Sequence, residues 1–393
     1  MATARGASYQ PARGSSFLDW DFDQAPFTLA WEITQACALA CVHCRATAQP
    51  YRDPRELSTS EGVDLIDQIV DIGGPILVIT GGDPMMRDDV YDLLDYAVGR
   101  GLRVALSPSA TGRVTRRALE RVKDTGTHMI HLSLDGSRPE IHDAFRGVRG
   151  SFDRTLSILK NAEELGFLIQ IGTTVTRHNV QDLEAIAEQV ARWSDVWTLF
   201  FLVPTGRGRE DQMLTPAEHE EVLNWLYGFS KRVPFHVRSI AAQQYRRIVI
   251  QGQREANPAK TAADSAAPPR WELTGAGFSV RGQAGPRPPS MRGVNDGNGF
   301  CFVSHIGEVY PSGFLQLKAG SVREQSLADI YRGSQLFREL RNSALLKGKC
   351  GVCEFRDVCG GSRARAYAVL GDYLAADPTC PYLPATLAAA KGQ

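Results

Sequence analysis

Three cysteines lie within eight residues near the start of the chain, in the sequence CALACVHC. They are Cys37, Cys41 and Cys44, and their spacing is C-x3-C-x2-C. An iron–sulfur cube needs one ligand for each of its irons, so three thiolates leave the fourth iron open. Catalytic metal sites use such an open position for chemistry. The alternative is a zinc ion with His43 as a fourth ligand, but His43 adjoins Cys44, which makes joint chelation of one tetrahedral ion awkward.

A second cysteine set lies toward the other end of the chain. Cys350, Cys353 and Cys359 have the spacing C-x2-C-x5-C, and Cys380 follows in the sequence DPTC. Four thiolates make a closed ligand set for a 4Fe–4S cluster, although a zinc ion can use the same four. A closed cluster has no open iron, so it suits electron transfer. The remaining cysteine, Cys301, lies in the apolar sequence GFCFVS and is predicted to be a core residue.

Composition and charge narrow the class of protein. Lys plus Arg and Asp plus Glu both number 44, so the formal net charge is zero, and nothing indicates a nucleic-acid or membrane partner. The chain has no run of about 18 apolar residues, and its N-terminal sequence lacks the apolar core of a signal peptide. We therefore expect a cytoplasmic protein, in which cysteines stay reduced and clustered cysteines are more often ligands than disulfides.

Apolar, β-rich runs with helical segments between them must position these cysteines. The helix expected over 58–73 has a capping box at Ser58 and Glu61. Alternating strands and helices predict parallel βαβ units, which could form a full barrel, a partial barrel or an open doubly wound sheet. The expected strands are 27–34, 76–80, 102–107, 129–135, 168–176 and 196–203.

Beyond the last of these strands the pattern changes. Residues 215–253 are expected to be helical, apart from a possible strand over 234–240. Residues 254–299 are rich in Ala, Pro and Gly, which indicates an irregular linker or insertion. A flexible cover over an active site is the alternative interpretation.

The cysteine motif and its place after the first strand resemble the radical S-adenosylmethionine (SAM) enzymes. The resemblance covers residues 25–385 and implies an α/β fold: a partial (β/α)6 barrel with a small iron–sulfur domain after it. In that family the open iron binds SAM, and one electron then yields a 5′-deoxyadenosyl radical; Cys37, Cys41 and Cys44 would be the catalytic ligands. The implied units are a leader at 1–24, the barrel at 25–240, an irregular segment at 241–299 and a SPASM/twitch-like domain at 300–385.

The resemblance also implies SAM contacts at the strand ends. The sequence TGGDP stands where the family has a GGE-type motif, with Asp83 in place of the commoner Glu and Pro84 after it. The backbone carbonyls of Gly81 and Gly82 would accept hydrogen bonds from the SAM ammonium. Arg146 could face the SAM carboxylate or be a surface cation. The other implied contacts are Ser107 in SPSATG, Ser133 in SLDG, Thr173 and Thr174 near the ribose, and Val203 in LVPTGRG, where backbone groups hold the adenine.

The second cysteine set resembles the SPASM/twitch extension of these enzymes. Full SPASM domains bind two auxiliary clusters and need more cysteines. Here Ser312 and Ser362 stand where relatives have cysteine. The resemblance therefore implies one auxiliary 4Fe–4S cluster, on Cys350, Cys353, Cys359 and Cys380.

The C-terminal sequence looks like the haem and haem d1 biosynthetic branch, whose members act on tetrapyrroles, for instance by oxidative decarboxylation of propionates. A radical SAM maturase of a ribosomal peptide and a non-catalytic iron–sulfur electron carrier are the alternatives. A reductant such as flavodoxin or ferredoxin is implied as a partner. Four arginines are candidates for binding carboxylates, although each could simply be solvated: 207, 209, 363 and 365.

Overall fold

The computed structural model describes residues 20–256, 271–274, 277–280 and 293–391. Among them, ten strands form one sheet in the order β12-β11-β10-β1-β2-β3-β4-β5-β6-β7. Strands β1 to β7 pair in parallel and in consecutive order, without the reversal at a switch point that an open doubly wound sheet would have. The barrel strands are β1 (Thr28–Glu32), β2 (Ile76–Thr80), β3 (Val104–Leu106), β4 (Met129–Ser133), β5 (Leu168–Val175), β6 (Val196–Phe201) and β7 (His236–Ile240).

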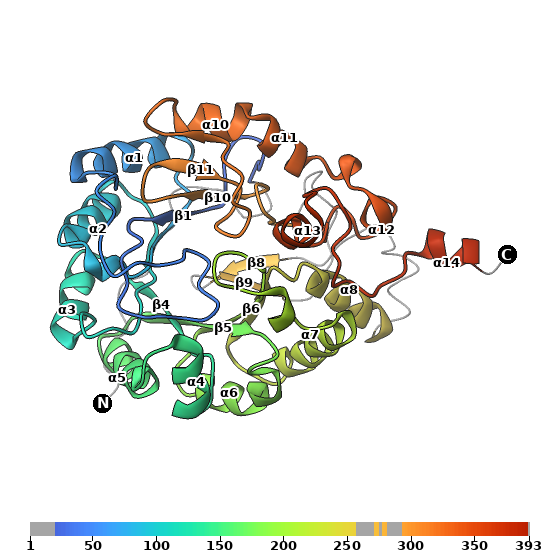
Figure 1. The fold of residues 1–393 in the computed structure, drawn as a ribbon, viewed down its shortest axis with the longest axis horizontal. Helices are drawn as coiled ribbons and strands as arrows, with labels where there is room; N and C mark the ends of the chain where they lie inside the picture. Colours follow the sequence, from blue (N-terminus) through green and yellow to red (C-terminus); the bar gives the residue numbers. More distant parts are fainter. Residues whose placement is uncertain (1–19, 257–270, 275–276, 281–292, 392–393) are drawn as a thin grey trace.

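Helices cover the outer face of these strands, while the strands curve around a common centre (Figure 1). The capping box predicted at Ser58 and Glu61 is confirmed at the start of α1. Gly101 and Gly166, which follow α2 and α5, have φ of 84° and 69°, a left-handed conformation that glycine adopts without strain. The helices are α1 (Thr59–Asp71), α2 (Val90–Gly99), α3 (Arg116–Asp124), α4 (Pro139–Arg146), α5 (Ser151–Glu164), α6 (Leu183–Val190), α7 (Pro216–Ser230) and α8 (Gln244–Ala256).

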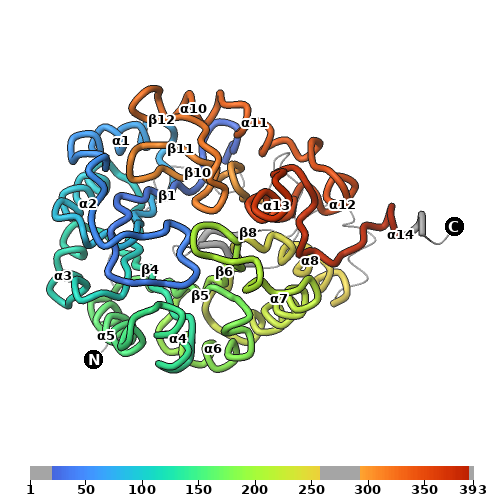
Figure 2. The backbone as a smooth tube through the Cα atoms, viewed as in Figure 1, coloured from blue at the N-terminus to red at the C-terminus, as the bar shows by residue number. Residues whose placement is uncertain are grey.

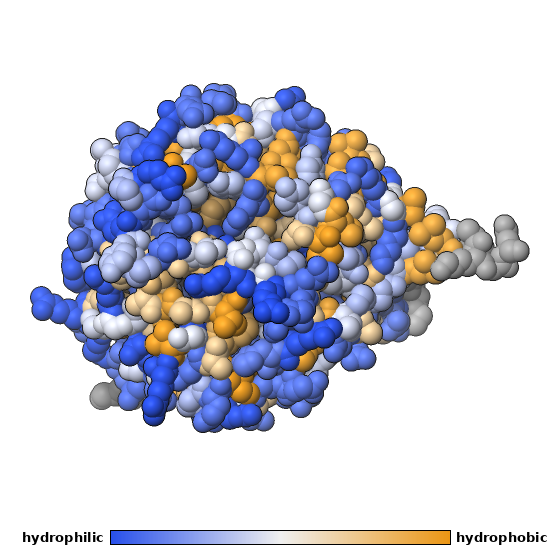
Figure 3. All heavy atoms as spheres, viewed as in Figure 1, coloured by the Kyte–Doolittle hydropathy of each residue, from blue (hydrophilic) through white to orange (hydrophobic). Residues whose placement is uncertain are grey.

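The main core lies between the strands and the outer helices. Trp31 on β1 and Trp197 on β6 are fully buried there. Trp197 makes edge-to-face contacts with Trp225 and Phe229 of α7, and burying each such large side chain contributes about 1.5–3 kcal/mol. Figure 3 shows that the rim is mainly polar, whereas apolar side chains gather toward the middle of this face and near α14. In the described ranges, every helix is too short or too polar to cross a bilayer.

The C-terminal region extends the same sheet beyond β1. Strand β10 pairs in parallel with β1, with Cys301 opposite Leu29, and β11 and β12 continue antiparallel. Segments far apart in sequence therefore lie side by side (Figure 2), and β1 is not left as an unpaired edge. The elements are β10 (Phe300–Val303), β11 (Glu308–Tyr310), β12 (Gly320–Ser321), α10 (Leu327–Gly333), α11 (Gln335–Arg341), α12 (Gly348–Gly351), α13 (Arg363–Leu370) and α14 (Ala385–Lys391).

The unit predicted to be irregular, 241–299, contains regular elements, and the first of them lies largely within the range 215–253 that was expected to be helical. Helix α8 occupies its first part, and β8 (Trp271–Thr274) pairs antiparallel with β9 (Gly277–Val280). The rest of the Pro- and Gly-rich stretch, at 257–270, 275–276 and 281–292, lies outside the described residues, as do residues 1–19 of the predicted leader. From residue 20 the chain already contacts the barrel, because the Trp20 side chain packs against the main core and makes an edge-to-face contact with Phe27 at 5.6 Å between ring centroids. The domain boundaries themselves stay predictions.

Candidate active site

The first cysteine motif lies in the loop after β1, at the carboxyl ends of the parallel strands, where barrel enzymes carry their active sites. Cys37 and Cys41 are buried and Cys44 is partly buried, and the three pack into one cluster. Cluster-bound thiolates are tuned by hydrogen bonds to sulfur, and each of these sulfurs has a donor. The donors are Leu39 N–H at 3.3 Å, Ala48 N–H at 3.5 Å and the Arg146 guanidinium at 3.7 Å.

The glycine pair after β2 packs against the backbone of the cysteine loop. The N–H of Gly82 donates to the Thr34 carbonyl at 2.8 Å. A Cβ atom on Gly82 would lie 2.5 Å from the Gln35 oxygen and 2.6 Å from the Ala36 oxygen, and a Cβ on Gly81 would lie 2.6 Å from the Thr34 oxygen. The glycines therefore place the residues that lead into the first cysteine. Their contact with SAM stays a prediction.

Asp83 joins the loop after β2 to the loop after β3. It is fully buried and accepts from the Thr111 hydroxyl at 2.6 Å and the Ser109 N–H at 3.3 Å. It also caps the short 3-10 helix that begins at the buried Pro84. Burial raises the pKa of Asp83, against the effect of these hydrogen bonds. Ser109 also donates to the Gly82 carbonyl at 2.6 Å; sequence reasoning missed Ser109 and Thr111, although both stand in SPSATG.

Arg146 lies between Asp135 and Cys41, with its side chain only 12% exposed, so it is not a surface cation. Its guanidinium pairs with Asp135, which also accepts from the Thr174 N–H at 2.7 Å. Burial lowers the pKa of Arg146, but attraction to Asp135 and Cys41 outweighs burial and holds the pKa above its usual value. The result is a permanent positive charge beside the cysteine loop. Sequence reasoning missed Asp135, although it belongs to the SLDG sequence.

His43 acts here as an aromatic residue. Its ring stacks on Phe145 at 4.0 Å between centroids, and Phe145 stacks on His178 at 5.3 Å. Burial, with the nearby charges of Arg146 and Arg207, lowers the pKa of His43 well below its usual value. In the described part of the chain, no three His, Cys, Asp or Glu side chains are placed to hold one metal ion; the thiolates of a cube bind different irons and need not converge on one point.

The predicted SAM contacts Ser133, at the end of β4, and Ser107, directly after β3, lie on the side of the sheet that faces away from the helices. Ser133 shares a face of β4 with His131, because side chains two residues apart in a strand point the same way. The intervening Leu132 belongs to the core that the helices cover. The His131 ring is hydrogen-bonded to Ser107 at 2.9 Å. His131 is a further polar residue of this interior face. The alternation of polar His131 and Ser133 with apolar Leu132 in the sequence could have indicated this.

The side chain of Thr173, predicted near the ribose, points instead toward the outer helices. Its hydroxyl donates to the Leu134 carbonyl at 2.7 Å and accepts from the Trp197 indole at 3.0 Å. Trp197 packs on α7, outside the barrel. Because neighbouring strand residues point to opposite faces, the partly exposed Thr174 is the one that faces the interior.

The loop after β6 lies against the cysteine loop. The Arg207 N–H donates to the Cys44 carbonyl at 2.9 Å, and Gly206 has φ of 60° with no room for a Cβ atom beside that carbonyl. Val203 is buried, and its carbonyl accepts from the Thr205 N–H at 2.8 Å; its contact with adenine stays a prediction. Two guanidinium nitrogens of Arg207 are buried without a hydrogen-bond partner in the described ranges. Arg207 is therefore a cation at the site that can accept an anion.

The other three candidate arginines are already engaged. Arg209 is exposed and pairs with Asp211. Arg363 and Arg365 are each 1% exposed, so neither is a solvated cation. Arg365 pairs with the buried Asp377 at 3.2 Å.

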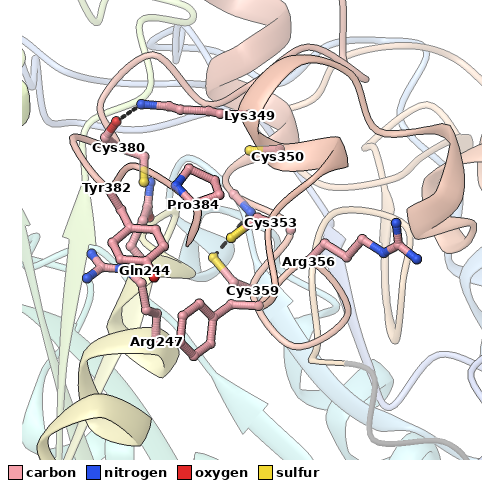
Figure 4. A pocket seen from close by; sticks show the side chains of 13 residues that line it. Gln244, Arg247, Lys349, Cys350, Cys353, Arg356, Cys359, Cys380, Tyr382 and Pro384 are labelled. Carbon is pink, nitrogen blue, oxygen red and sulfur yellow. Dashed lines mark hydrogen bonds between the residues drawn. The ribbon is translucent and has the colours of Figure 1, made fainter. Parts of the chain in front are cut away.

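The four cysteines of the second set line one pocket (Figure 4). Gln244 and Arg247 of α8 border it, together with Phe355 and Tyr382. The sulfurs receive donors here too: Gly361 N–H lies 3.5 Å from one and the Arg363 guanidinium 3.9 Å from another. The donor set therefore fits a four-thiolate cluster. The cysteines are Cys350, Cys353, Cys359 and Cys380.

The serines at the two missing cysteine positions have structural hydrogen bonds. Ser362 caps α13, accepting from the Arg365 N–H at 3.1 Å, and Ser312 accepts from Leu315 N–H at 3.1 Å. Cys301 is fully buried in the main core, as predicted, and burial raises the pKa of its thiol.

A buried charged network ties the cysteine loop to the C-terminal region. Glu32 at the end of β1 accepts from Arg45 at 2.9 Å and lies 3.1 Å from His305, whose other ring nitrogen is 3.5 Å from Asp53. Burial lowers the pKa of His305, but the hydrogen bond and charge of Glu32 outweigh it and raise the pKa. The pKa of Glu32 is lowered: burial acts against the shift, and Arg45 and His305 outweigh it.

This network predicts a pH-dependent stability. A raised pKa in the folded state means that the His305 contribution is fully present below its unfolded pKa of about 6.5 and is lost as pH rises through the folded value. We expect His305→Gln to be less stable than the parent near pH 6, with the difference shrinking toward about pH 9. Urea unfolding of the metal-free chains at several pH values measures this. A difference that stays constant across the range would contradict it.

The match of the chain to known proteins agrees with this geometry. The family model described as "Radical SAM superfamily" matches residues 31–190. The chain is 42% identical to the AdoMet-dependent heme synthase of Nitratidesulfovibrio vulgaris, over 91% of this chain and 92% of that one. It is 31% identical to the mycofactocin maturase MftC of Mycolicibacterium smegmatis, over 91% and 83%.

The fold is similar to that of Streptococcus suis SuiB bound to S-adenosylmethionine, with a TM-score of 0.65, 15% identity, and coverage of 91% of this chain and 78% of that one. Members of the matched family use a 4Fe–4S cluster and SAM, and Cys37, Cys41 and Cys44 stand inside the matched range. The chain therefore belongs to the radical SAM superfamily of iron–sulfur enzymes.

Proposed function

We propose that this enzyme modifies a haem-type tetrapyrrole by oxidative decarboxylation of propionate side chains. The observation that carries the proposal is the 42% identity, over nearly the whole of both chains, to a heme synthase. A protein named Fe-coproporphyrin III synthase, from Methanosarcina barkeri, is 30% identical over 93% of this chain. The maturases, at 31% identity, support peptide modification less strongly.

When bound at the first cysteine set, the cluster supplies one electron that cleaves SAM to the 5′-deoxyadenosyl radical. The chain would orient the reactants: the loops after β1, β2, β3 and β6 contact one another, and Ser133 and Thr174 lie on the interior face of the strands. In the proposed substrate step, the propionate side chain gives one hydrogen atom to the radical, which becomes 5′-deoxyadenosine. The side chain then releases CO2 and one electron and becomes a vinyl group.

We also propose a second 4Fe–4S cluster on Cys350, Cys353, Cys359 and Cys380, which could take up that electron. The supporting observations are the four thiols around one pocket and the donors to their sulfurs. A reductant such as flavodoxin or ferredoxin in the cytoplasm, where thiols stay reduced, would supply the first electron.

An anaerobic assay tests the proposed function. The reconstituted enzyme is incubated with SAM, dithionite and an iron porphyrin that bears propionates, and products are followed by mass spectrometry. We expect 5′-deoxyadenosine, CO2 and a porphyrin with vinyl groups in place of propionates, in proportion to one another. If 5′-deoxyadenosine forms while the porphyrin stays unchanged, the radical chemistry stands and the tetrapyrrole proposal fails.

Arg207 provides a sharper prediction. Its two buried nitrogens that have no partner among the described residues suit a propionate carboxylate, and a hydrogen bond to a charged group contributes about 1.5–3 kcal/mol. We expect Arg207→Gln to raise KM for the porphyrin about 10- to 100-fold with a smaller change in kcat. The exposed Arg209, paired with Asp211, provides the matched control: Arg209→Gln should change neither constant. A raised KM for SAM instead would place the anion on SAM and contradict the assignment.

A further inference from the structure

Among the described residues, two arginines beside the second cysteine set, Arg363 and Arg246, make no ion pair with a carboxylate. The buried Arg363 donates through Nη1 to the Tyr373 carbonyl at 2.9 Å and the Ala375 carbonyl at 2.7 Å. Its Nε donates to the Gly361 carbonyl at 3.4 Å, and its Nη2 lies 3.9 Å from the Cys350 sulfur. In the described ranges no ion pair within 4.0 Å involves it. The charge of Arg363 contributes to the lowered pKa of Asp372, but the hydrogen bond from Lys347 contributes more.

Arg246 of α8 is held at the residue that precedes another cysteine of the set, Cys359. Its guanidinium donates to the Val358 carbonyl at 2.9 Å and to the Val294 carbonyl. Burial lowers the pKa of Arg246 to about 10, and the charge of the nearby Cys359 acts in the opposite direction. Carbonyl groups satisfy the donors of both arginines but do not neutralise their charges.

The neighbouring arginines differ, because each has its own carboxylate. Arg247 pairs with Glu220 at 2.5 Å, and Arg365 with Asp377 at 3.2 Å. An unpaired buried charge is strongly unfavourable, so such cations persist where an anion compensates them. A cluster held by four thiolates carries a net negative charge that grows when the cluster is reduced.

We propose that Arg363 and Arg246 raise the reduction potential of the second cluster. Each places a positive charge beside one thiolate, at Cys350 and Cys359, and so stabilises the reduced, more negative state more than the oxidised state. In a site screened from water such a charge acts strongly. The inference rests on the proposed second cluster but does not depend on the tetrapyrrole substrate.

The test uses the full chain with Cys37, Cys41 and Cys44 replaced by alanine, so that only the second cluster remains. Redox titration followed by electron paramagnetic resonance measures its potential. At the potential where the parent is half reduced, Arg363→Met should lower the ratio of reduced to oxidised cluster about tenfold or more, which is about 59 mV for a one-electron couple. Arg363→Lys keeps the charge and should restore part of the shift.

Arg356→Met is the matched control. This arginine lies on the same cysteine loop with its side chain 44% exposed, so solvent screens its charge, and its loss should change the ratio less than twofold. The inference would be overturned if Arg363→Met held its full iron content with an unchanged potential, or if Arg356→Met shifted the potential equally. Neither outcome would contradict the second cluster itself. No iron in the parent would overturn the second cluster as well.

If the variants bind the cluster poorly, their potential cannot be titrated, and a second measurement is then used. The increase in Tm between metal-free and loaded chain reports how strongly the folded protein favours the cluster. This increase should be smaller in Arg363→Met than in Arg356→Met and should recover in Arg363→Lys. If Arg363→Met and Arg363→Lys both fail to hold iron, the guanidinium is needed for packing rather than for its charge, and the inference is wrong.

Discussion

Replacing Cys41 with alanine is expected to abolish the formation of 5′-deoxyadenosine and to remove the first cluster, about four irons per chain. The cubane would have only two of its three ligands, on Cys37 and Cys44. The change would also remove the sulfur that faces Arg146 at 3.7 Å, leaving that cation paired with Asp135 alone. Iron analysis and product quantification after anaerobic reconstitution with SAM and dithionite measure both effects.

Cys301→Ala provides the matched control for this experiment. Cys301 is equally a buried cysteine, but it lies in β10 within the main core and away from the cysteine loop. We expect a destabilisation of about 0.5–3 kcal/mol with iron content and product formation retained. Undiminished 5′-deoxyadenosine formation by Cys41→Ala would refute the assignment of the first cluster.

The strands of the barrel could be predicted because each is a short apolar run between clear helical segments. The expected strands at 76–80 and 196–203 correspond to β2 (Ile76–Thr80) and β6 (Val196–Phe201). Capping is equally local, so Ser58 and Glu61 marked the start of α1 without any knowledge of the fold. The cysteine spacing is local in the same way.

Pairing between distant segments left no such signal. That β10 lies beside β1 depends on contacts between residues about 270 positions apart, and no periodicity within either strand specifies its neighbour. The charged network of Glu32 and His305 has the same origin. Each residue taken alone is an ordinary polar residue; only the fold brings them to 3.1 Å.

The predicted SAM contacts show a different limit of sequence analysis, because neighbouring side chains in a strand point to opposite faces. In the sequence GTTV, a resemblance cannot decide between Thr173 and Thr174, yet a one-residue difference sends a side chain to the opposite face. The structure turns Thr173 toward Trp197 and the helices. Asp83 illustrates a further limit: its carboxylate is engaged by Thr111 and Ser109, a role that its type and position did not indicate. Its contact with SAM stays a prediction.

Gly82→Ala is expected to remove most of the first cluster and to lower 5′-deoxyadenosine formation at least a hundredfold. The new Cβ atom would lie 2.5 Å and 2.6 Å from the backbone oxygens of Gln35 and Ala36, and backbone cannot move aside as a flexible side chain can. Ala36 directly precedes Cys37, and its carbonyl accepts from the Asp83 N–H at 2.7 Å. A displacement of about 1 Å at a catalytic group can cost a hundredfold in rate.

Gly112→Ala is the matched control, because a Cβ atom there would meet nothing within 4 Å although the residue also follows a barrel strand. It should keep full iron content and activity. The two variants are compared by iron analysis, by product formation and by urea unfolding, where overpacking at Gly82 should cost about 1–3 kcal/mol. If Gly82→Ala holds the first cluster as well as Gly112→Ala does, the close contact between the two loops is not what positions the cysteines. The glycine pair would then have to act through SAM alone, and a raised KM for SAM would be its only effect.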